Sequence, residues 1–388
     1  MPAAPIYLDA NATTCPLPDT ISALALAMAD GPLNPSSAHA RGARARELGM
    51  VARDEVADLV GCAVPEAIVF TSGGTEANNM ALAAHAWDER LTLVVSAVEH
   101  ASVLRPAEAA ARRGVDLRVL PVDAGGLVDP AALNDAVSTA RDNLIVSIQW
   151  ANSETGVLQP LPALLAGIKG KRDAFLHSDA VQAVGKVPVD IQASGVDALS
   201  LSGHKVHGPA GIGALVTVDT GDAPLRPMLF GGEQQRGLRP GSEPIPLMVG
   251  LGAAMRGRLL RFDEDVAHLR RLRDLFETGL KDALPEVSIN ASTAPRLPNT
   301  ANVRFPDVDG GALVAQLDDL GIQCSQGSAC SSGKPQPSHV LLAMGLSERE
   351  AYASVRFAFS VMNTDDEVCR AVEIVAMTAG GLRGRTPW

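Results

Sequence analysis

Residues 198–213 read Ala198-Leu199-Ser200-Leu201-Ser202-Gly203-His204-Lys205-Val206-His207-Gly208-Pro209-Ala210-Gly211-Ile212-Gly213. The apolar start predicts a β-strand, and the glycines after it predict a tight turn that other backbone segments approach closely. Similar apolar runs precede it, and they are Ile68-Val69-Phe70, Leu93-Val94-Val95, Leu117-Arg118-Val119-Leu120, Leu144-Ile145-Val146-Ser147-Ile148 and Ala174-Phe175-Leu176-His177. Alanine-rich helical stretches, such as 76–87 and 130–140, separate them. This alternation predicts an α/β fold in which helices cover a mainly parallel sheet.

The chain of 388 residues exceeds what one core usually supports, so we expect two packed units. Residues 1–20 hold Pro, Asn and Thr in quick succession and predict an extended arm, associated with the smaller unit rather than part of a core. Residues 21–250 form the predicted large α/β domain. An amphipathic pattern over 248–284 predicts one connecting helix, so residues 251–388 comprise this helix and a smaller α+β domain. The strands expected in the smaller domain are 302–305 and 355–359.

Composition and charge indicate which binding partners and which cellular compartment to expect. Hydrophobic residues make up 46% and the formal net charge is −11, which disfavours nucleic acid and anionic membranes as partners. No uncharged apolar run reaches about 18 residues and the start lacks the features of a signal peptide, so we expect a cytoplasmic protein. The five cysteines are odd in number and scattered, which predicts neither a disulfide framework nor a metal site.

Lys205 follows the strand of the opening stretch and is the first candidate for chemistry. Lysine forms Schiff bases with carbonyl compounds, and pyridoxal 5'-phosphate is the commonest biological aldehyde held in this way. An isolated lysine in a turn is more often a surface residue, so the interpretation depends on its neighbours. The run Thr71-Ser72-Gly73-Gly74-Thr75 also follows a strand and opens a helix, where backbone N–H groups and the helix dipole favour a phosphate.

Three polar residues follow other predicted strands. Asp179 has the charge to pair with a protonated pyridine nitrogen, and Gln182 comes three residues later. His100 has a flat ring that is suited to stacking on another ring. The carboxyl ends of parallel strands share one edge of a sheet, so these side chains are expected to meet there.

In this order the motifs resemble the NifS-like cysteine desulfurases, which are class-V aminotransferase-family members of the fold-type-I pyridoxal-phosphate enzymes. The resemblance covers nearly the whole chain. Its segments are Tyr7 to Thr14, Asn34 to Ser37, Thr71 to Asn78, His177 to Gly185, Ser202 to Gly213 and Gly327 to Ser332. It implies a large cofactor-binding domain with a mainly parallel sheet between helices, and a smaller α+β domain.

The resemblance also implies roles for individual residues. Lys205 would hold the cofactor aldehyde, Asp179 the pyridine nitrogen and Gln182 the ring hydroxyl, while His100 stacks on the ring. The implied phosphate ligands are Gly74, Thr75, Ser202, His204 and Ser242 of the partner subunit, which indicates a homodimer with shared active sites. Arg356 would bind the substrate carboxylate, because its planar guanidinium can donate two parallel hydrogen bonds to it. Asn34 would assist in binding the same carboxylate.

One segment departs from the pattern that family members often carry. They have Asn-Asn-Glu where this chain has Asn152-Ser153-Glu154. In strict register the asparagine that contacts the cofactor falls on Ser153, and a serine retains one hydrogen bond. The contact is therefore assigned to either Asn152 or Ser153.

The stretch Ser325-Gln326-Gly327-Ser328-Ala329-Cys330-Ser331-Ser332-Gly333-Lys334 predicts an exposed loop, because its residues are small and turn-forming. An exposed thiol ionises and reacts more easily than a buried one. The Gly-Ser-Ala-Cys-x-Ser motif resembles that of desulfurases with a long catalytic loop, and it makes Cys330 the expected sulfur acceptor. Cys324 is expected to be a core residue.

The implied reaction converts L-cysteine to L-alanine. Lys205 takes the α-proton, Cys330 accepts the sulfur as a persulfide, and His100 exchanges a proton near that sulfur. The persulfide then passes to an acceptor protein, such as a scaffold for iron–sulfur clusters. Three alternatives stay open: a selenocysteine lyase, an aminotransferase, and a catalytically idle interaction scaffold.

Overall fold

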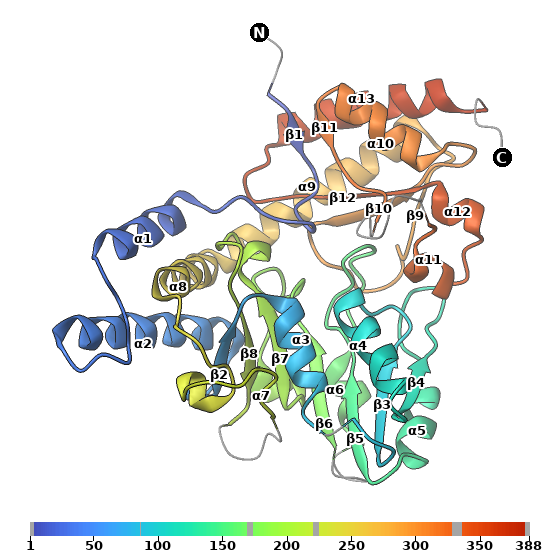
Figure 1. The fold of residues 1–388 in the computed structure, drawn as a ribbon. Helices are drawn as coiled ribbons and strands as arrows, with labels where there is room; N and C mark the ends of the chain where they lie inside the picture. Colours follow the sequence, from blue (N-terminus) through green and yellow to red (C-terminus); the bar gives the residue numbers. More distant parts are fainter. Residues whose placement is uncertain (1–3, 86, 169–173, 220–224, 328–335, 385–388) are drawn as a thin grey trace.

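The computed structural model describes residues 4–85, 87–168, 174–219, 225–327 and 336–384, and a seven-stranded sheet lies at its centre (Figure 1). The strand order is β2-β8-β7-β6-β5-β3-β4. The bounds are β2 Ile68–Thr71, β3 Leu91–Ser96, β4 Asp116–Leu120, β5 Asn143–Ser147, β6 Phe175–Asp179, β7 Ala198–Ser202 and β8 Gly213–Thr217. Strands β4, β3, β5, β6 and β7 pair in parallel, whereas β8 is antiparallel to both β2 and β7. The predicted mainly parallel sheet is confirmed, and β8 is an addition.

Helices cover both faces of this sheet, which explains its continuous apolar strands. In β3, Val94 belongs to one buried cluster while Leu93 and Val95 belong to another, because successive side chains point to opposite faces. The helices around the sheet are α1 Pro18–Ala29, α2 Ala40–Val60, α3 Gly74–Leu82, α4 Ala101–Ala111, α5 Pro130–Ser138, α6 Leu161–Leu165, α7 Ile191–Ser194 and α8 Ile245–Leu260. Short 3-10 helices occur at η1 Pro65–Ala67, η2 Gly203–Lys205 and η3 Gln234–Gly237.

A second, antiparallel sheet with strand order β12-β10-β9 is built from the C-terminal part of the chain (Figure 1). Its elements are β9 Ser288–Ile289, β10 Thr300–Arg304, β12 Ser354–Ala358, α9 Phe262–Ala283, α10 Gly310–Asp319, α11 His339–Ala343, α12 Glu348–Tyr352 and α13 Asp365–Leu382. Its core is aromatic, with the Phe276 ring centroid 4.7 Å from that of Phe357 and 5.4 Å from that of Phe359. Both predicted strands of this region, 302–305 and 355–359, are confirmed as β10 and β12.

The N-terminal arm enters this second core. Strand β1 (Ile6–Tyr7) pairs in parallel with β11 (Ile322–Gln323), and Ile6 and Leu8 are fully buried among the phenylalanines. The expectation of an arm outside any core is therefore wrong for these residues. Their alternating apolar pattern was too short to identify from sequence, and its partner strand lies more than 300 residues away.

The single connecting helix predicted over 248–284 is also wrong, because α8 and α9 are separate helices that meet at Arg261. Arg261 has φ −116° and ψ 16°, outside the helical region. The acidic run from Asp263 to Asp265 stabilises a new helix N-terminus through its dipole, and Arg258 pairs with Asp265 across the bend. The division into domains near residue 250 stays a prediction.

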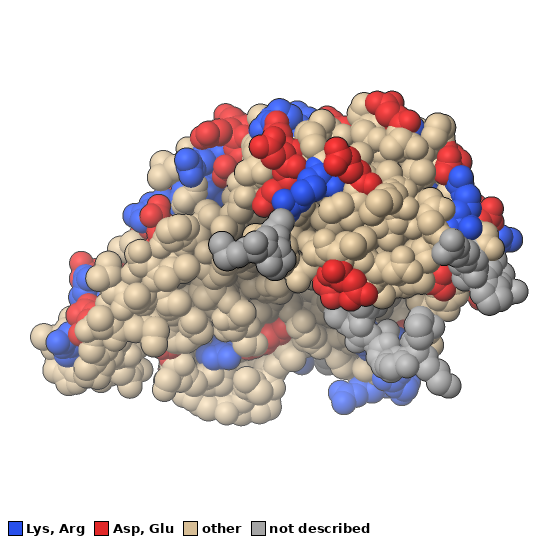
Figure 2. All heavy atoms as spheres, turned by 90° about the horizontal axis from the view of Figure 1, so that it is seen from above, with Lys and Arg blue, Asp and Glu red and all other residues tan. Residues whose placement is uncertain are grey.

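The surface seen from above carries acidic and basic side chains close together, without a large basic patch on that face (Figure 2). This mixed pattern agrees with the acidic balance of the sequence. Among the described helices, none combines the length and apolarity needed to cross a bilayer.

Candidate active site

Four of the predicted site residues lie at the carboxyl edge of the large sheet. Asp179 ends β6, Ser202 ends β7, and His100 follows β3 as the cap of α4. Lys205 ends the 3-10 turn that follows β7. Parallel strands bring residues that are far apart in sequence to one edge, as the alternating pattern predicted.

The Lys205 amine points at the N-terminal arm. Its Nζ donates to the backbone oxygens of Asn11 and Ala12, both at 2.6 Å. Gln182 Nε2 donates to the same Asn11 oxygen at 2.9 Å, so the side chains of Lys205 and Gln182 meet at one carbonyl. The turn around Lys205 requires glycine, because a Cβ at Gly208 would lie 2.9 Å from the Gly203 oxygen.

The carboxylate of Asp179 is held by neutral donors. Its Oδ2 accepts from Asn78 Nδ2 at 2.7 Å and its Oδ1 from the Val181 N–H at 3.0 Å. Asn78 also donates to Ser102 Oγ at 2.8 Å, and Ser102 Oγ lies 2.7 Å from Nδ1 of His100. One hydrogen-bonded chain therefore orients both Asp179 and His100. These donors satisfy the Asp179 carboxylate without changing its negative charge, which suits a cationic ligand.

The imidazoles at this edge are neutral near pH 7. Burial lowers the pKa of His100, and the charges of Lys205 and His339 lower it further, while Asp179 and Glu154 act in the opposite sense. Burial beside Lys205 and Lys186 lowers the pKa of His204 to about 4. A neutral ring at His100 is able to accept a proton or to stack on another ring.

A fully buried carboxyl directly precedes His100 in the chain. Glu99 is fully buried, and burial raises the pKa of its carboxyl to about 8. Its Oε1 accepts from Ser96 Oγ at 2.5 Å and from the Gln149 N–H at 2.8 Å, whereas Oε2 has no hydrogen-bond partner among the described residues. Sequence reasoning missed Glu99, although it directly precedes His100.

Helix α3 begins against β7, at the place where the sequence predicts a phosphate site. A Cβ at Gly74 would lie 2.6 Å from Val181 Cγ2 and 3.6 Å from Ser202 Cβ, so only glycine allows this approach. The first N–H groups of a helix, here those of Gly74 and Thr75, find no acceptor inside the helix. His204 follows Ser202 by two residues, and its Nδ1 lies 3.1 Å from Thr13 Oγ1.

Arg356 lies on β12 with 5% of its surface exposed, between the arm and the loop that follows β5. Its Nη2 donates to Asp9 and its Nη1 to the Ser153 oxygen at 3.2 Å, while the buried Nε has no partner among the described residues. Asn34 is not joined to this guanidinium by any hydrogen bond of the described chain. It lies in an exposed turn, where its Oδ1 accepts from the Ser36 N–H at 3.0 Å.

The two candidates after β5 have different surroundings. Asn152 is 2% exposed and its amide is engaged by its own loop. Its Oδ1 accepts from the N–H groups of Glu154 and Thr155, both at 2.9 Å, and its Nδ2 donates to the Val98 oxygen. Ser153 is half-buried, and its backbone oxygen accepts from Arg356.

Ser242 and the cysteines are the remaining predicted residues. Ser242 is exposed, and Arg239 shortly before it pairs with Glu76 in the first turn of α3 at 3.0 Å. Cys330 lies outside the described residues. Burial raises the pKa of the Cys324 thiol to about 12, which agrees with the expected unreactive core cysteine.

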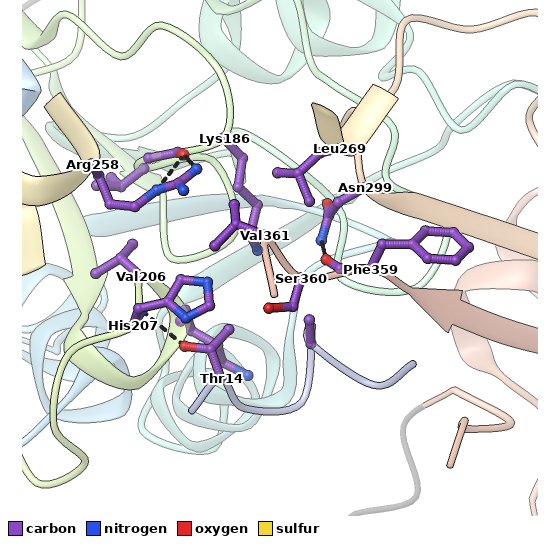
Figure 3. Close-up of a pocket in the computed structure, with 14 residues that line it drawn as sticks. Thr14, Lys186, Val206, His207, Arg258, Leu269, Asn299, Phe359, Ser360 and Val361 are labelled. Atoms are coloured by element: carbon purple, nitrogen blue, oxygen red, sulfur yellow. Dashed lines mark hydrogen bonds between the residues drawn. The ribbon is translucent and has the colours of Figure 1, made fainter. Parts of the chain in front are cut away.

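A pocket behind Lys205 brings in residues that sequence reasoning did not identify (Figure 3). Lys186 lines it together with His207 and Arg258, and its Nζ donates to Gln182 Oε1 at 2.8 Å. Burial and the neighbouring cations hold the pKa of Lys186 well below its ordinary value. Asn11 connects this group to Lys205, and the only sequence signal for it was its place in the motif Tyr7 to Thr14.

These groups fit pyridoxal phosphate. Lys205 supplies an amine, and Asp179 supplies a carboxylate held by neutral donors. The start of α3 offers backbone N–H donors for a phosphate. The donor set therefore matches the aldehyde, the ring nitrogen and the phosphate of this cofactor.

Comparison with known proteins agrees with this geometry. The aminotransferase class-V family model matches residues 6–370. A cysteine desulfurase of Sinorhizobium fredii (strain NBRC 101917 / NGR234) is 41% identical over 386 residues, which cover 99% of this chain and 98% of the relative. A solved NifS-like protein from Rickettsia africae ESF-5 is 33% identical with a TM-score of 0.85, over 97% of this chain and 99% of that one. The structure of SspA in complex with cysteine is 33% identical with a TM-score of 0.79, over 91% and 98%. The chain therefore belongs to the aminotransferase class-V family, among its NifS-like cysteine desulfurases.

Proposed function

We propose that this protein is a pyridoxal-phosphate-dependent cysteine desulfurase, which converts L-cysteine to L-alanine and transfers the sulfur to Cys330 as a persulfide. The observation that carries the proposal is the meeting of an amine and a carboxylate around one imidazole. Asp179 is joined to His100 through Asn78 and Ser102, and Lys205 lies at the same sheet edge, where it shares the Asn11 oxygen with Gln182. The cysteine desulfurases similar over nearly the full chain support the same activity.

The cofactor, when bound, draws electrons away from the α-carbon of an amino acid attached to it. Lys205 would hold its aldehyde, Asp179 its ring nitrogen and Gln182 its hydroxyl, with His100 stacked on the ring. The proposed phosphate ligands are Gly74, Thr75, Ser202, His204 and Ser242 of the partner subunit. Of the two candidates after β5 we favour Ser153, because the amide of Asn152 already bonds to Glu154 and Thr155 of its own loop and to the Val98 oxygen after β3.

The protein side chains then divide the remaining work. The guanidinium of Arg356 binds the substrate carboxylate in competition with Asp9, and Asn34 assists it. The Lys205 Nζ takes the α-proton as general base, and the neutral His100 ring exchanges a proton near the substrate sulfur. The Cys330 thiolate forms the new S–S bond, while the substrate Cβ–S bond breaks and its electron pair remains with the carbon skeleton that becomes alanine.

The proposed partners are a second copy of this chain and a sulfur-acceptor protein, such as an iron–sulfur scaffold. Exposed apolar residues support an interface: Phe230 is 92% and Leu229 53% exposed, in the same loop region as Ser242. A cytoplasmic location is proposed from the composition alone.

The test is to incubate the purified holoprotein with L-cysteine and a reductant, and to follow sulfide and alanine. In Cys330→Ala we expect the yellow colour of the bound cofactor to be kept, while sulfide release collapses. Cys369→Ala, which changes an exposed cysteine on α13, is the matched control and should behave as wild type. Undiminished turnover in Cys330→Ala would remove this thiol from the mechanism.

A further inference from the structure

Lys186 is a buried amine that the proposed mechanism does not use. It is 5% exposed and lines the pocket behind Lys205 (Figure 3). The charges that act most strongly on it are those of Lys205, Arg258 and Arg356, and all three are cationic. Burial among like charges costs free energy, which an apolar side chain of similar length would avoid. Stability alone therefore does not account for a lysine at this position.

Lys186 closes a ring of three hydrogen bonds with Gln182 and Asn11. Its Nζ donates to Gln182 Oε1 at 2.8 Å and to Asn11 Oδ1 at 3.4 Å. The Nε2 of Gln182 donates to the Asn11 backbone oxygen at 2.9 Å. All three residues are buried, so water competes little for these bonds. The ring joins the turn after β6 to the N-terminal arm.

Asn11 is also held by residues outside this ring. Its Nδ2 donates to Thr300 Oγ1 at 2.9 Å and to the Ser153 oxygen at 3.1 Å. Its Oδ1 accepts from Asn299 Nδ2 at 3.1 Å. These contacts should keep Asn11 in place without Lys186, so the glutamine is the member of the ring that depends on the lysine.

The ring sets which end of the Gln182 amide faces Lys205. The Asn11 backbone oxygen accepts hydrogen bonds and donates none, so only the NH2 end of Gln182 suits it. The carbonyl end is then directed to Lys186, whose amine supplies the donor. Lys205 Nζ donates to the same Asn11 oxygen at 2.6 Å, so the NH2 end of Gln182 shares one acceptor with the Lys205 amine. An amide NH2 carries two hydrogens, and the second suits an oxygen of a group attached to Lys205.

We propose that Lys186 is a positioning residue, which holds the amide of Gln182 so that its NH2 end faces the ring hydroxyl of the cofactor on Lys205. This inference rests on the proposed function, in which Gln182 binds that hydroxyl. A donor that is already held in place loses less freedom when the cofactor binds, so its hydrogen bond contributes more to the affinity. Lys186 thereby acts on the cofactor through Gln182.

The experiment is a double-mutant cycle on the holoprotein, with the dissociation constant of pyridoxal phosphate as the readout. This constant is measured by equilibrium dialysis and followed through the visible absorption band. Gln182→Leu should raise it roughly 10-fold, because one hydrogen bond to the cofactor is lost. Lys186→Met keeps a similar side-chain length and should raise it about 3- to 10-fold, because the same donor is no longer held. Adding Lys186→Met to Gln182→Leu should change it by less than about twofold, since the residue through which Lys186 acts is already gone.

Two further measurements separate positioning from a general loss of structure. Both single variants should shift the visible absorption maximum in the same direction, because both alter the donor at the ring hydroxyl. In the Gln182→Leu background, Lys186→Met removes a buried amine that has lost one of its acceptors, so the thermal midpoint should stay the same or rise. Lys281→Met changes an exposed lysine of α9 and is the control, which should match wild type in every measurement.

Three outcomes would overturn the inference. One is a double variant whose dissociation constant rises by the product of the two single changes. Another is a Lys186→Met variant that binds pyridoxal phosphate as tightly as wild type. The third is a lower thermal midpoint for Lys186→Met in the Gln182→Leu background, which would assign the lysine to packing. A wild type that shows no visible band with pyridoxal phosphate would instead refute the proposed function, and the inference would fall with it.

Discussion

The two sides of the site are held together in different ways. On the cofactor side, Asp179 ends β6, Ser202 ends the adjacent strand β7, and His100 follows β3 of the same sheet, so the strand pairing sets their spacing. On the substrate side, Arg356 is joined to Asp9 and Ser153, which are 347 and 203 residues away in sequence. The first side depends on secondary structure, and the second on packing between distant segments. Mutations should therefore affect the two sides differently.

Lys205→Ala should give the largest effect, on the cofactor side. The variant loses both the covalent attachment and the general base, so sulfide release should fall by roughly 10²- to 10⁴-fold. The visible absorption band of the bound cofactor should change at the same time. Lys281→Ala, an exposed lysine in the last turn of α9, is the control. Retention of the wild-type spectrum in Lys205→Ala would refute the lysine assignment.

Phe276→Ala tests how far the substrate side depends on its own core. The ring is fully buried against Phe357 and Phe359, and removing it should cost about 3–5 kcal/mol of unfolding free energy. We expect denaturant unfolding of the C-terminal region at lower concentration, and weaker L-cysteine binding because β12 carries Arg356. Leu320→Ala, at a half-exposed site, is the control. Equal denaturation midpoints for the two variants would contradict the claim that this aromatic cluster stabilises the C-terminal region.

Arg356→Lys should separate substrate binding from cofactor binding. A lysine lacks the planar fork, so the KM for L-cysteine should rise roughly 10- to 100-fold through the loss of charge-assisted hydrogen bonds. The cofactor spectrum should stay as in wild type, since Arg356 lies on the other side. Arg304→Lys, on the neighbouring strand β10, is the control. A changed cofactor spectrum with an unaltered KM for L-cysteine would mean that Arg356 acts on the cofactor and not on the substrate.

The smallest effect concerns Glu99, which directly precedes His100. Its pKa is raised to about 8, so between about pH 4.5 and 8 the folded state keeps a proton that the unfolded state has lost. Stability from this group is therefore complete at low pH and falls as the pH rises, by at most about 1.4 kcal/mol per pH unit. Glu99→Gln should flatten the decline of the thermal midpoint between pH 5 and 8. Glu108→Gln changes a half-exposed carboxylate on α4 and is the control, because it should leave the decline of the thermal midpoint between pH 5 and 8 as in wild type.

Sequence patterns predicted which residues lie at the carboxyl edge of the large sheet, for a physical reason. Strands buried on both faces are continuous apolar runs, and the polar residue that ends such a run lies at the ligand edge. Lys205 and Asp179 were found in this way. Strand β8 was missed because its glycine-containing start continued a segment that predicted a turn.

The other functional residues were beyond such reasoning, since their roles come from partners distant in sequence. Asn11 contacts Lys205 over 194 residues and Gln182 over 171. No sequence pattern marks Lys186, because only the fold shows that it is buried beside another lysine. The predicted roles of Asn34 and Ser242 stay predictions, as does that of Cys330.

The pairing of the first strand with late parts of the chain has a consequence for synthesis on the ribosome. Leu8 and Ala10 bond to Ala358, and Ile6 bonds to Gly321, so these early residues find no partner until almost the entire polypeptide has emerged. The carbonyl that receives the Lys205 amine belongs to Asn11 in the same stretch. A nascent chain that stops before Ser354 thus cannot complete the lysine environment, although its large sheet is already present.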